Sequence, residues 1–430
     1  MSLKLKTATL GCKVNQYETE LVREGLLNAG YQDAQDRQPA DLCVVNTCTV
    51  TAEGDAKSRQ VIRKLARGNP QARIVVMGCY ATRAPAELWR LPGVVEVVTD
   101  KRELPDLLGR FGVVEMPRGV SGLSDRHRAY VKVQDGCLLN CSFCIIPQVR
   151  PHMVSRPPHE ILAEVQGLVE RGYREIVLTG IHLGHYGVDF NKRLPKRRWT
   201  RLSHLVDRLA ELPGDFRLRL SSIEATEVTH ELIAVMANHA GRVCPHLHVS
   251  MQSGSDAVLR RMRRRWGSRR YVDRCQMFRQ RLDQAAITTD IIVGFPGETE
   301  DDFGATCRVA REVGFSKIHI FPFSARRGTP AAEMPGQLPK SVKQQRARHL
   351  AEVEAELRDD YFRGLLGRRL QVLVEGTSRR DAESLTGTSC RYAPVDLPAG
   401  TATAGEFVTV TAASTAHGRI RGQEGERRAQ

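Results

Sequence analysis

The sequence has no long hydrophobic run and, before His127, no histidine. No stretch approaches the ~18 consecutive apolar residues of a membrane-spanning helix, so no membrane segment is expected. The opening residues, MSLKLKTATLGC, enter a predicted strand almost at once, without the apolar core and cleavage site of a signal peptide. We therefore expect a cytoplasmic protein. Its 11 cysteines would then be reduced, so metal or redox chemistry explains them better than a disulfide framework.

Acidic residues are in the minority. The chain carries 64 Lys and Arg against 49 Asp and Glu, a net charge of +15. This excess suits a nucleic-acid partner, because phosphates supply most of the non-specific affinity, although plain solubility is the alternative. The rest of the composition, with 41% hydrophobic and 26% charged residues, is typical of a globular protein. With 430 residues the chain is long enough for two or three domains.

Three cysteines near the start of the sequence each follow a predicted strand. Residues 7–10 form the first strand, and Asn15 with a glutamate three residues later predicts a capped helix start, so Cys12 lies at the turn between them. LCVVNTC ends in the same way at Cys48, and RIVVMGC ends at Cys79. Helical patterns follow at residues 16–29, 56–67 and 85–91. Repeated strand, turn and helix predict a parallel sheet with helices on its faces.

The carboxyl ends of parallel strands lie at one edge of a sheet, where ligands bind, so Cys12, Cys48 and Cys79 (the N-terminal trio) are expected to meet. Buried core cysteines are the alternative, but such a cysteine lies inside a strand, as Cys43 does. Thiolate ligation favours zinc or an iron–sulfur cluster. Structural zinc normally takes a fourth protein ligand, and no histidine is present here. Three ligands therefore favour an iron–sulfur cluster with one open iron.

A second group of cysteines lies on a loop, VQDGCLLNCSFCIIP. Cys137, Cys141 and Cys144 (the loop trio) have the spacing C-x3-C-x2-C, again without a fourth cysteine nearby. Six strand-like runs surround this loop and continue after it, with helical patterns between most of them. They predict an open relative of the (β/α)8 barrel, whose active site lies at the carboxyl ends of the strands. The predicted strands are residues 130–134, 175–179, 217–220, 246–250, 288–293 and 317–323.

The loop-trio spacing resembles the cluster loop of radical S-adenosylmethionine (SAM) enzymes. In that superfamily the open iron of a [4Fe–4S] cluster binds SAM, and an electron from the cluster cleaves SAM to methionine and a 5′-deoxyadenosyl radical. The resemblance implies that Phe143 lies beside the adenine of SAM. It also implies cofactor contacts from the turns after the strands, at Gly180, Ser250, Gln252 and Gly294.

The two trios together resemble the methylthiotransferases, over nearly the whole chain. The similar motifs are LGCKVNQYE, VVNTCTVT, MGCYA, LTGIHLGHYG, RLSSIE, QSGSD, DIIVGFPGETEDDF and FPFSARRGTPAAEM. The implied fold class is α/β: an N-terminal parallel-sheet cluster domain, a partial (β/α)6 radical SAM barrel and a small C-terminal β-barrel of the TRAM type. The expected domains are residues 1–118, 123–360 and 361–425.

The resemblance implies two [4Fe–4S] clusters with different tasks. The N-terminal trio would hold an auxiliary cluster that carries the sulfur to be transferred, and the loop trio would hold the cluster that cleaves SAM. One SAM would methylate that sulfur, and a second would supply the radical that removes hydrogen from an unactivated substrate carbon. A reducing electron donor and a sulfur source, both of unknown identity, would be needed as well.

The motif LGCKVNQYE is similar to the branch that methylthiolates C2 of N6-threonylcarbamoyladenosine, 3′ to the anticodon, which implies a tRNA anticodon stem-loop as partner. Lys13, Val14 and Asn15 differ from the usual run of the isopentenyladenosine branch, and from that of the branch acting on an aspartate of a small-subunit ribosomal protein. Those two substrates are the alternatives. A non-catalytic, metal-containing RNA-binding protein is the alternative from another class.

An arginine-rich run, RRMRRRWGSRR, predicts an RNA contact with an aromatic side chain for base stacking, the alternative being a solvated helix face. The polar insertion RLPKRRWTRL is a second basic candidate. Residues 151–153 depart from the family pattern, which puts the contacts of that loop in question. The candidate RNA-contacting residues are Arg263, Arg264, Arg265 and Trp266.

Overall fold

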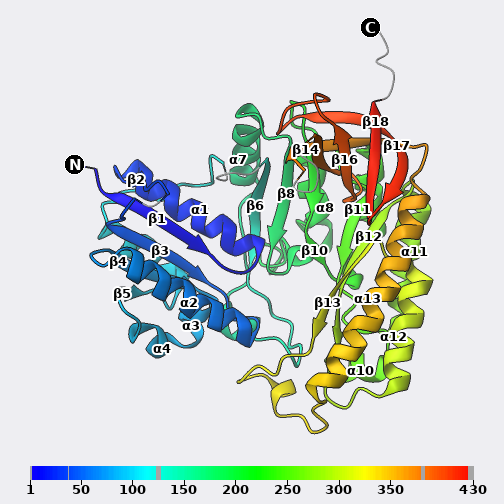
Figure 1. The fold of residues 1–430 in the computed structure, drawn as a ribbon, viewed down its shortest axis with the longest axis horizontal. Helices are drawn as coiled ribbons and strands as arrows, with labels where there is room; N and C mark the ends of the chain where they lie inside the picture. Colours follow the sequence, from blue (N-terminus) through cyan, green and yellow to red (C-terminus); the bar gives the residue numbers. More distant parts are fainter. Residues whose placement is uncertain (1, 37, 123–126, 379–382, 425–430) are drawn as a thin grey trace.

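The computed structural model describes residues 2–36, 38–122, 127–378 and 383–424. Figure 1 shows an N-terminal sheet between helices, a central open barrel and a small C-terminal β-barrel, which confirms the predicted fold class. No helix in the described ranges has both the length and the apolar character needed to cross a membrane. Of the expected domain limits, 123 and 425 lie outside the described residues, and 361 falls in the last turn of helix α13 (Lys340–Arg363).

The N-terminal part is a parallel five-stranded sheet in the order β2-β1-β3-β4-β5. Alternate residues of a strand face opposite sides, so Leu42 and Val44 pack in one apolar cluster, with α1 and α5, and Cys43 and Val45 in the other, with α2. Burial on both faces explains the continuous apolar runs. The elements are β1 (Lys4–Thr9), α1 (Lys13–Asn28), β2 (Gln32–Asp33), β3 (Leu42–Thr47), α2 (Ala52–Gly68), β4 (Arg73–Gly78), α3 (Cys79–Arg83), α4 (Pro85–Trp89), β5 (Val94–Val97), η1 (Lys101–Glu103) and α5 (Leu104–Gly109).

The start of α1 differs from the sequence prediction. The helix begins at Lys13, directly after Cys12, and no side chain caps its first turn. The prediction of Asn15 as the cap is wrong, because its amide instead donates to the carbonyls of Leu10 (2.9 Å) and Thr47 (3.1 Å). Asn15 therefore ties the turn that carries Cys12 to the end of β3.

The central part contains the six predicted strands, β6, β8, β9, β11, β12 and β13, in two sheets ordered β7-β6-β8-β9 and β10-β11-β12-β13. One residue, Ser221, separates β9 from β10, so the strands follow one another around a partial barrel. Among the described residues no pairing joins β13 to β6, which leaves the barrel open on that side. The strands are β6 (Arg128–Asp135), β7 (Val154–Ser155), β8 (Glu175–Gly180), β9 (Arg217–Leu220), β10 (Ser222–Ile223), β11 (His246–Val249), β12 (Ala286–Val293) and β13 (Lys317–Pro322).

Helices cover the outside of this partial barrel and share one large apolar cluster with its strands (Figure 1). Their order along the chain follows the predicted alternation of strand and helix. Those in the cluster are α7 (Pro158–Glu170), η2 (Leu183–His185), α8 (Leu202–Ala210), η4 (Ala225–Glu227), α9 (His230–Asn238), α10 (Asp256–Arg261), α11 (Ser268–Arg281), α12 (Glu300–Val313) and α13. The short helices α6 (Ile146–Val149), η3 (Lys196–Arg198) and η5 (Pro330–Ala332) lie in the connecting segments.

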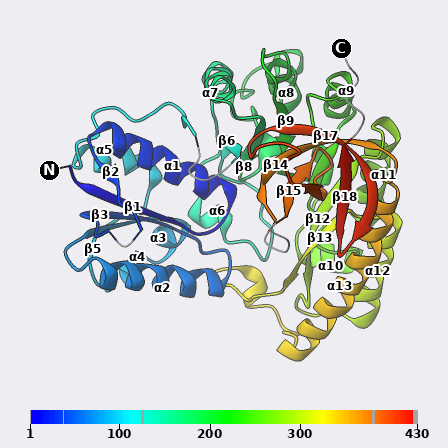
Figure 2. The same cartoon turned by 45° about the horizontal axis from the view of Figure 1, so that its top comes forward.

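The C-terminal part is a closed barrel in the order β14-β15-β16-β18-β17, at the front in Figure 2. It is fixed to the central barrel by two buried arginines of β9. Arg217 donates to the carbonyl of Thr388 (2.9 Å), and Arg219 donates to the carbonyl of Ser389 (3.0 Å). Its strands are β14 (Arg369–Thr377), β15 (Ser384–Ser389), β16 (Pro394–Pro398), β17 (Phe407–Ala416) and β18 (Arg419–Glu424).

Candidate active site

The N-terminal trio lies at the carboxyl ends of three adjacent strands. Cys12 precedes α1, Cys48 follows β3 directly, and Cys79 is the first residue of α3, directly after β4. The three thiols are close enough to interact: burial raises the pKa of Cys48, and the charges of Cys79 and Cys12 raise it further. The geometry thus brings together the three cysteines as the sequence predicted.

Two glycines in the left-handed region make these turns possible. Gly11 has φ 100° and Gly78 has φ 98°. A Cβ atom on Gly11 would lie 3.1 Å from Cys48 Sγ, and one on Gly78 would lie 2.3 Å from Asn46 Oδ1. Any side chain at Gly78 would therefore strain the backbone and collide with β3 just before Cys79.

The loop trio follows β6 of the central barrel. The Cys144 amide donates to the Cys141 carbonyl (3.1 Å), which folds the loop so that its thiols converge. Burial raises the pKa of Cys144 to about 12; a backbone hydrogen bond opposes this shift and the neighbouring thiols add to it. Burial also raises the pKa of Cys141. Such thiols stay protonated until a metal replaces the proton, so metal binding here would release protons.

A basic side chain contacts a sulfur in each trio. Arg150 Nε donates to Cys79 Sγ (3.3 Å) and Arg264 Nη1 to Cys141 Sγ (3.4 Å). His182 Nδ1 lies 3.6 Å from Cys137 Sγ. Hydrogen bonds to cluster sulfurs stabilise the reduced form of a cluster, and sequence reasoning missed all three donors.

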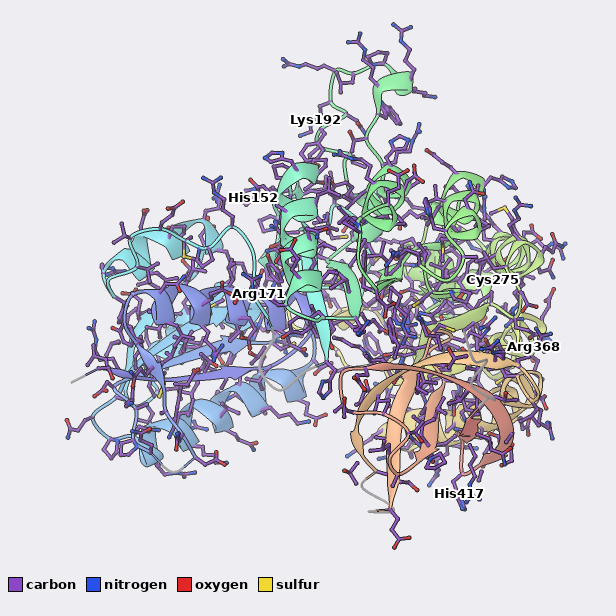
Figure 3. All side chains as sticks on the ribbon, turned by 90° about the horizontal axis from the view of Figure 1, so that it is seen from above. His152, Arg171, Lys192, Cys275, Arg368 and His417 are labelled. Carbon is purple, nitrogen blue, oxygen red and sulfur yellow. The ribbon has the colours of Figure 1, made fainter. Side chains whose placement is uncertain are left out.

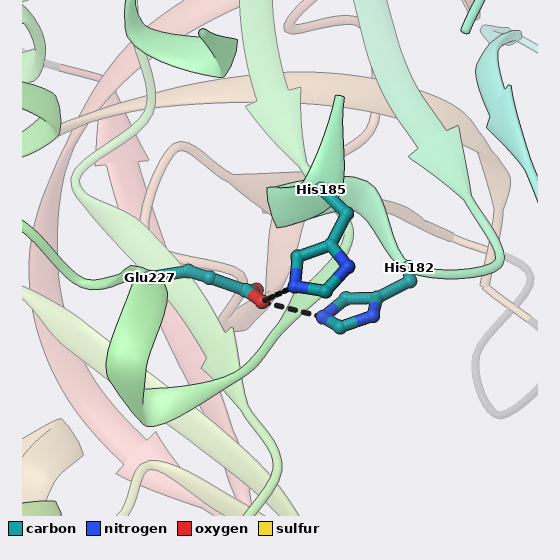
Figure 4. Close-up of side chains that lie close together, drawn as sticks. All are labelled: His182, His185 and Glu227. Carbon is teal, nitrogen blue, oxygen red and sulfur yellow. Dashed lines mark hydrogen bonds and ion pairs between the residues drawn. The ribbon is translucent and has the colours of Figure 1, made fainter. Parts of the chain in front are cut away.

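Two carboxylates at the short turn η4 support the donors of the loop trio: Glu224 caps its start and Glu227 is its last residue. Glu227 bonds the other nitrogen of His182, and Glu224 pairs with Arg264 (Figure 4 draws the Glu227 group). Burial alone would lower the pKa of His182, but Cys137 and Glu227 outweigh burial and raise it to about 10. At pH 7 the imidazole therefore carries protons on both nitrogens and donates to sulfur and to carboxylate.

Metal ligands must lie close together. In the described ranges one group of three or more His, Cys, Asp or Glu residues has all its ligand atoms within 4.8 Å of one another, and it consists of His182, His185 and Glu227. Around one tetrahedral zinc, with Zn–S near 2.3 Å, cysteine sulfurs would lie about 3.8 Å apart. Neither cysteine trio is that compact. Three convergent thiols with wider spacing suit a multinuclear cluster better than a single ion, which disfavours structural zinc.

Arg150 is the centre of a buried ion-pair network that joins the N-terminal sheet to the central barrel. It donates to both oxygens of Glu18 (2.9 and 3.0 Å) and to Asp135 Oδ1 (2.7 Å). Lys101 and Lys132 also pair with Glu18, at 2.5 and 3.0 Å. These five residues (the Glu18 network) hold three cations and two carboxylates, and burial opposes but does not prevent a Glu18 pKa well below its usual range.

The predicted SAM contacts divide into two groups. Phe143 and Gln252 line a cavity of about 230 Å³ together with Cys144, Asp290 and Phe321, as expected for a cofactor held beside the loop trio. The other three predicted residues do not line this cavity, although each lies at a strand end. They are Gly180, Ser250 and Gly294.

The predicted RNA-contact run is only half exposed. Arg263 and Arg265 reach solvent, but the Arg264 side chain is 3% exposed and Trp266 is buried against Tyr271. The prediction that Arg264 and Trp266 contact RNA at the surface is therefore wrong. Arg263 has φ 59°, and this turn directs the next arginine inward, toward Cys141.

The second basic candidate, residues 193–202, is exposed over residues 193–198 and half-buried or buried after them. The exposed segment includes the preceding Lys192 and projects from the body of the molecule (Figure 3). This segment carries five basic residues. Of the two predicted basic regions, it is therefore the more accessible to an RNA backbone.

Two family models match the chain. Residues 4–100 match "Uncharacterized protein family UPF0004", and residues 131–310 match "Radical SAM superfamily". Among solved structures, the radical SAM methyltransferase TsrM from Kitasatospora setae is similar with a TM-score of 0.55 at 14% identity, covering 77% of each chain. The fold and the matched region therefore define a radical SAM protein, a class that uses SAM and a [4Fe–4S] cluster.

The curated relatives narrow the class. "Threonylcarbamoyladenosine tRNA methylthiotransferase MtaB" from Bacillus subtilis is 41% identical, with 87% of this chain and 85% of that protein covered. "tRNA-2-methylthio-N(6)-dimethylallyladenosine synthase" from Mycobacterium ulcerans is 39% identical, with 87% and 74% covered. The chain belongs to the radical SAM methylthiotransferase family.

Proposed function

We propose that this enzyme transfers a methylthio group to C2 of N6-threonylcarbamoyladenosine, next to the anticodon of tRNA, giving 2-methylthio-N6-threonylcarbamoyladenosine. The observation that supports this proposal most is the pair of cysteine trios, with a basic side chain on one sulfur of the N-terminal trio and on two sulfurs of the loop trio. The names of the MtaB relatives, at 38–41% identity, support this substrate. A cytoplasmic location is part of the proposal, since tRNA is the substrate.

Each trio has its own task in the proposal. The N-terminal trio holds an auxiliary [4Fe–4S] cluster that bears the transferred sulfur, and the loop trio holds the SAM-cleaving cluster. Bound at these sites, the clusters and SAM supply the sulfur, the methyl group and a substrate radical. The protein itself orients the thiols, through Asn15 and the glycine turns, and donates hydrogen bonds to their sulfurs. An external electron donor and a sulfur source complete the system.

The three expected domains have distinct roles in this proposal. Residues 1–118 carry the auxiliary cluster and residues 123–360 the SAM chemistry. Residues 361–425, with the exposed segment 192–198, would bind the anticodon stem-loop. Phe143 and Gln252 would contact SAM in the cavity beside Cys144.

The test compares two cysteine variants after anaerobic reconstitution. Cys144→Ala is expected to lose about half of the bound iron and all cleavage of SAM to 5′-deoxyadenosine. Cys12→Ala is expected to lose a similar share of iron, to retain SAM cleavage and to form no methylthio product. One cluster per chain in the unaltered protein, with Cys12 dispensable, would contradict the proposal.

The substrate is tested separately by mass spectrometry of tRNA nucleosides from cells with and without the gene. Loss of 2-methylthio-N6-threonylcarbamoyladenosine, with accumulation of its unthiolated parent, is expected. Loss of the methylthio derivative of isopentenyladenosine instead would assign the substrate of the dimethylallyladenosine relatives. An unchanged nucleoside profile would exclude both tRNA reactions.

A further inference from the structure

A second cavity, of about 490 Å³, lies inside the open barrel and between all three parts of the chain. Gly11 and Lys13, on either side of Cys12, line it from the N-terminal sheet, and Tyr392 lines it from the C-terminal barrel. It shares Asp290 and Phe321 with the cavity that contains Cys144. A molecule bound here would therefore lie between the two cysteine trios, and the volume is that of a small-molecule site.

Among the charged side chains that line this cavity, cations outnumber carboxylates. Lys13, Arg128 and Arg219 line it, against the single carboxylate of Asp290. Arg128 and Arg219 are already paired with the buried carboxylate of Glu175, which sits behind them. Lys13 differs, because no hydrogen bond or ion pair to its ammonium group is found in the described parts of the chain. Among the described residues that line the cavity, Lys13 is therefore the cation left to pair with a ligand.

The cavity that Lys13 lines also contains a neutral hydrogen-bonding side chain, His246. His246 is 3% exposed and lines the cavity, and its Nδ1 has no partner while its Nε2 bonds Thr288 Oγ1 (3.0 Å). Burial, with repulsion from Arg219, holds the pKa of His246 well below its usual range, so the ring is neutral. A buried polar nitrogen without a partner costs free energy that a hydrogen-bonding ligand would recover.

The two nucleoside side chains named for the curated relatives differ in this chemistry. A threonylcarbamoyl group carries a carboxylate, a hydroxyl and a urea, whereas a dimethylallyl group is wholly apolar. The apolar group would leave the Lys13 ammonium and His246 Nδ1 unpaired in a confined space. A relative named for threonylcarbamoyladenosine is 41% identical to this chain and one named for dimethylallyladenosine is 39% identical, so overall identity does little to distinguish the two substrates.

We propose that this cavity binds the anionic N6 side chain of the substrate adenosine, with Lys13 as the counter-ion of its carboxylate and His246 as a hydrogen-bonding partner of its neutral groups. The inference rests on the proposed function and assigns the residue that selects the threonylcarbamoyl nucleoside. Lys13 is thus a specificity-determining residue, placed one position from a cysteine of the N-terminal trio.

The test is anaerobic equilibrium binding of reconstituted enzyme to two anticodon stem-loop RNAs. One carries N6-threonylcarbamoyladenosine, and the other carries its carboxamide, which has the same shape without the charge. A hydrogen bond to a charged group predicts that the unaltered enzyme prefers the carboxylate RNA by about 10- to 100-fold. Equal affinity for the two RNAs would overturn the inference.

Variants assign the preference to its residue. Lys13→Met is expected to bring the ratio of the two dissociation constants close to one, and Lys13→Arg to restore most of it. His246→Phe, which keeps an aromatic ring beside Tyr392, is expected to weaken both RNAs and to leave the ratio unchanged. Lys57→Met, on an exposed lysine of α2, is the matched control and is expected to match the unaltered enzyme.

Cluster loss is monitored because Lys13 adjoins Cys12, so iron and sulfide are measured in each variant before binding. A Lys13→Met enzyme that keeps its iron and the full charge preference would refute the role of Lys13. If the Lys13→Met enzyme loses iron, the His246→Phe enzyme tests the cavity instead. Unchanged affinity of that enzyme for both RNAs would refute the assignment of the cavity to the N6 side chain. Methylthio product without charge preference would overturn this inference alone, whereas charge-selective binding without product would overturn the proposed reaction alone.

Discussion

Removing the charge of Glu18 or of Arg150 from the Glu18 network should lower the free energy of unfolding, but by different amounts. The five residues hold three cations and two carboxylates, and both Arg150 and Glu18 are almost fully buried. Glu18→Gln leaves three cations facing one carboxylate, whereas Arg150→Met leaves two of each. Breaking a buried ion pair costs about 3–5 kcal/mol, most of it from the uncompensated charge. We therefore expect about 5 kcal/mol for Glu18→Gln and about 3 kcal/mol for Arg150→Met.

The assay is urea-induced unfolding of the cluster-free protein, read from the first transition, because a chain with several apolar cores does not have to unfold in one step. The double variant should be more stable than the sum of the two losses predicts, by about 0.5–3 kcal/mol, since the two residues contact each other. Arg110→Gln breaks an ion pair in which the arginine is 63% exposed and serves as the control, with a loss below about 1 kcal/mol. Equal losses for Glu18→Gln and Arg150→Met, or the reverse order, would refute the charge argument.

Four further outcomes are expected. His182→Gln removes a charged hydrogen bond to Cys137 and should make the midpoint potential of the SAM-cleaving cluster more negative in an EPR-monitored redox titration; an unchanged potential would contradict this role. Gly78→Ala should cost at least about 2 kcal/mol in urea unfolding and lower the iron content, unlike an alanine at an open glycine. Because the folded pKa of Glu18 lies below its unfolded value near 4.3, the Glu18 network should stabilise fully above about pH 5 and lose this contribution as the pH falls, with Glu18→Gln flattening the pH–stability curve. Replacing Arg197 and Arg198 by Gln should weaken tRNA binding and reduce the slope of log K against log salt by about 1–2, and an unchanged slope would exclude the projecting segment from the interface.

Much of the fold could be predicted from local pattern. The central strands β3 and β4 of the N-terminal sheet are apolar runs because both of their faces are covered. Parallel topology then places the cysteines that follow the strands at one edge. The six barrel strands were also located within a few residues, although strands such as β9 (RLRL) and β11 (HLHV) alternate polar and apolar residues. Helix starts were less certain, as at Asn15, because a side chain that could cap a helix can equally bond a neighbouring strand.

The hydrogen-bond donors of the cysteines could not be predicted in this way. Arg264 stands in a uniformly basic run, and its partners, Cys141 and Glu224, lie 123 and 40 residues away in sequence. His182 follows a strand in a turn-like motif, and both Cys137 and Glu227 lie 45 residues from it. Local periodicity carries no information on such pairings. A tryptophan two residues after Arg264 was one usable signal, because large aromatic side chains are more often buried than exposed.

Two ion-pair clamps hold the N-terminal sheet over the open side of the barrel. Arg150 lies in the segment that follows the loop trio, after β6, and reaches Cys79 and Glu18. Arg326, after β13, forms buried contacts with Asp55 and with Thr49, the neighbour of Cys48. Since β6 and β13 border the opening, the clamps fix the N-terminal sheet from both sides.

The clamps also connect structure to the proposed chemistry. A deprotonated Cys79, as iron binding requires, would neutralise the one excess cation of the Glu18 network. Cluster binding and docking of the N-terminal sheet should therefore stabilise each other. Loss of Arg150 would then weaken both at once, and it would loosen the spacing between the two trios on which transfer of a sulfur group depends.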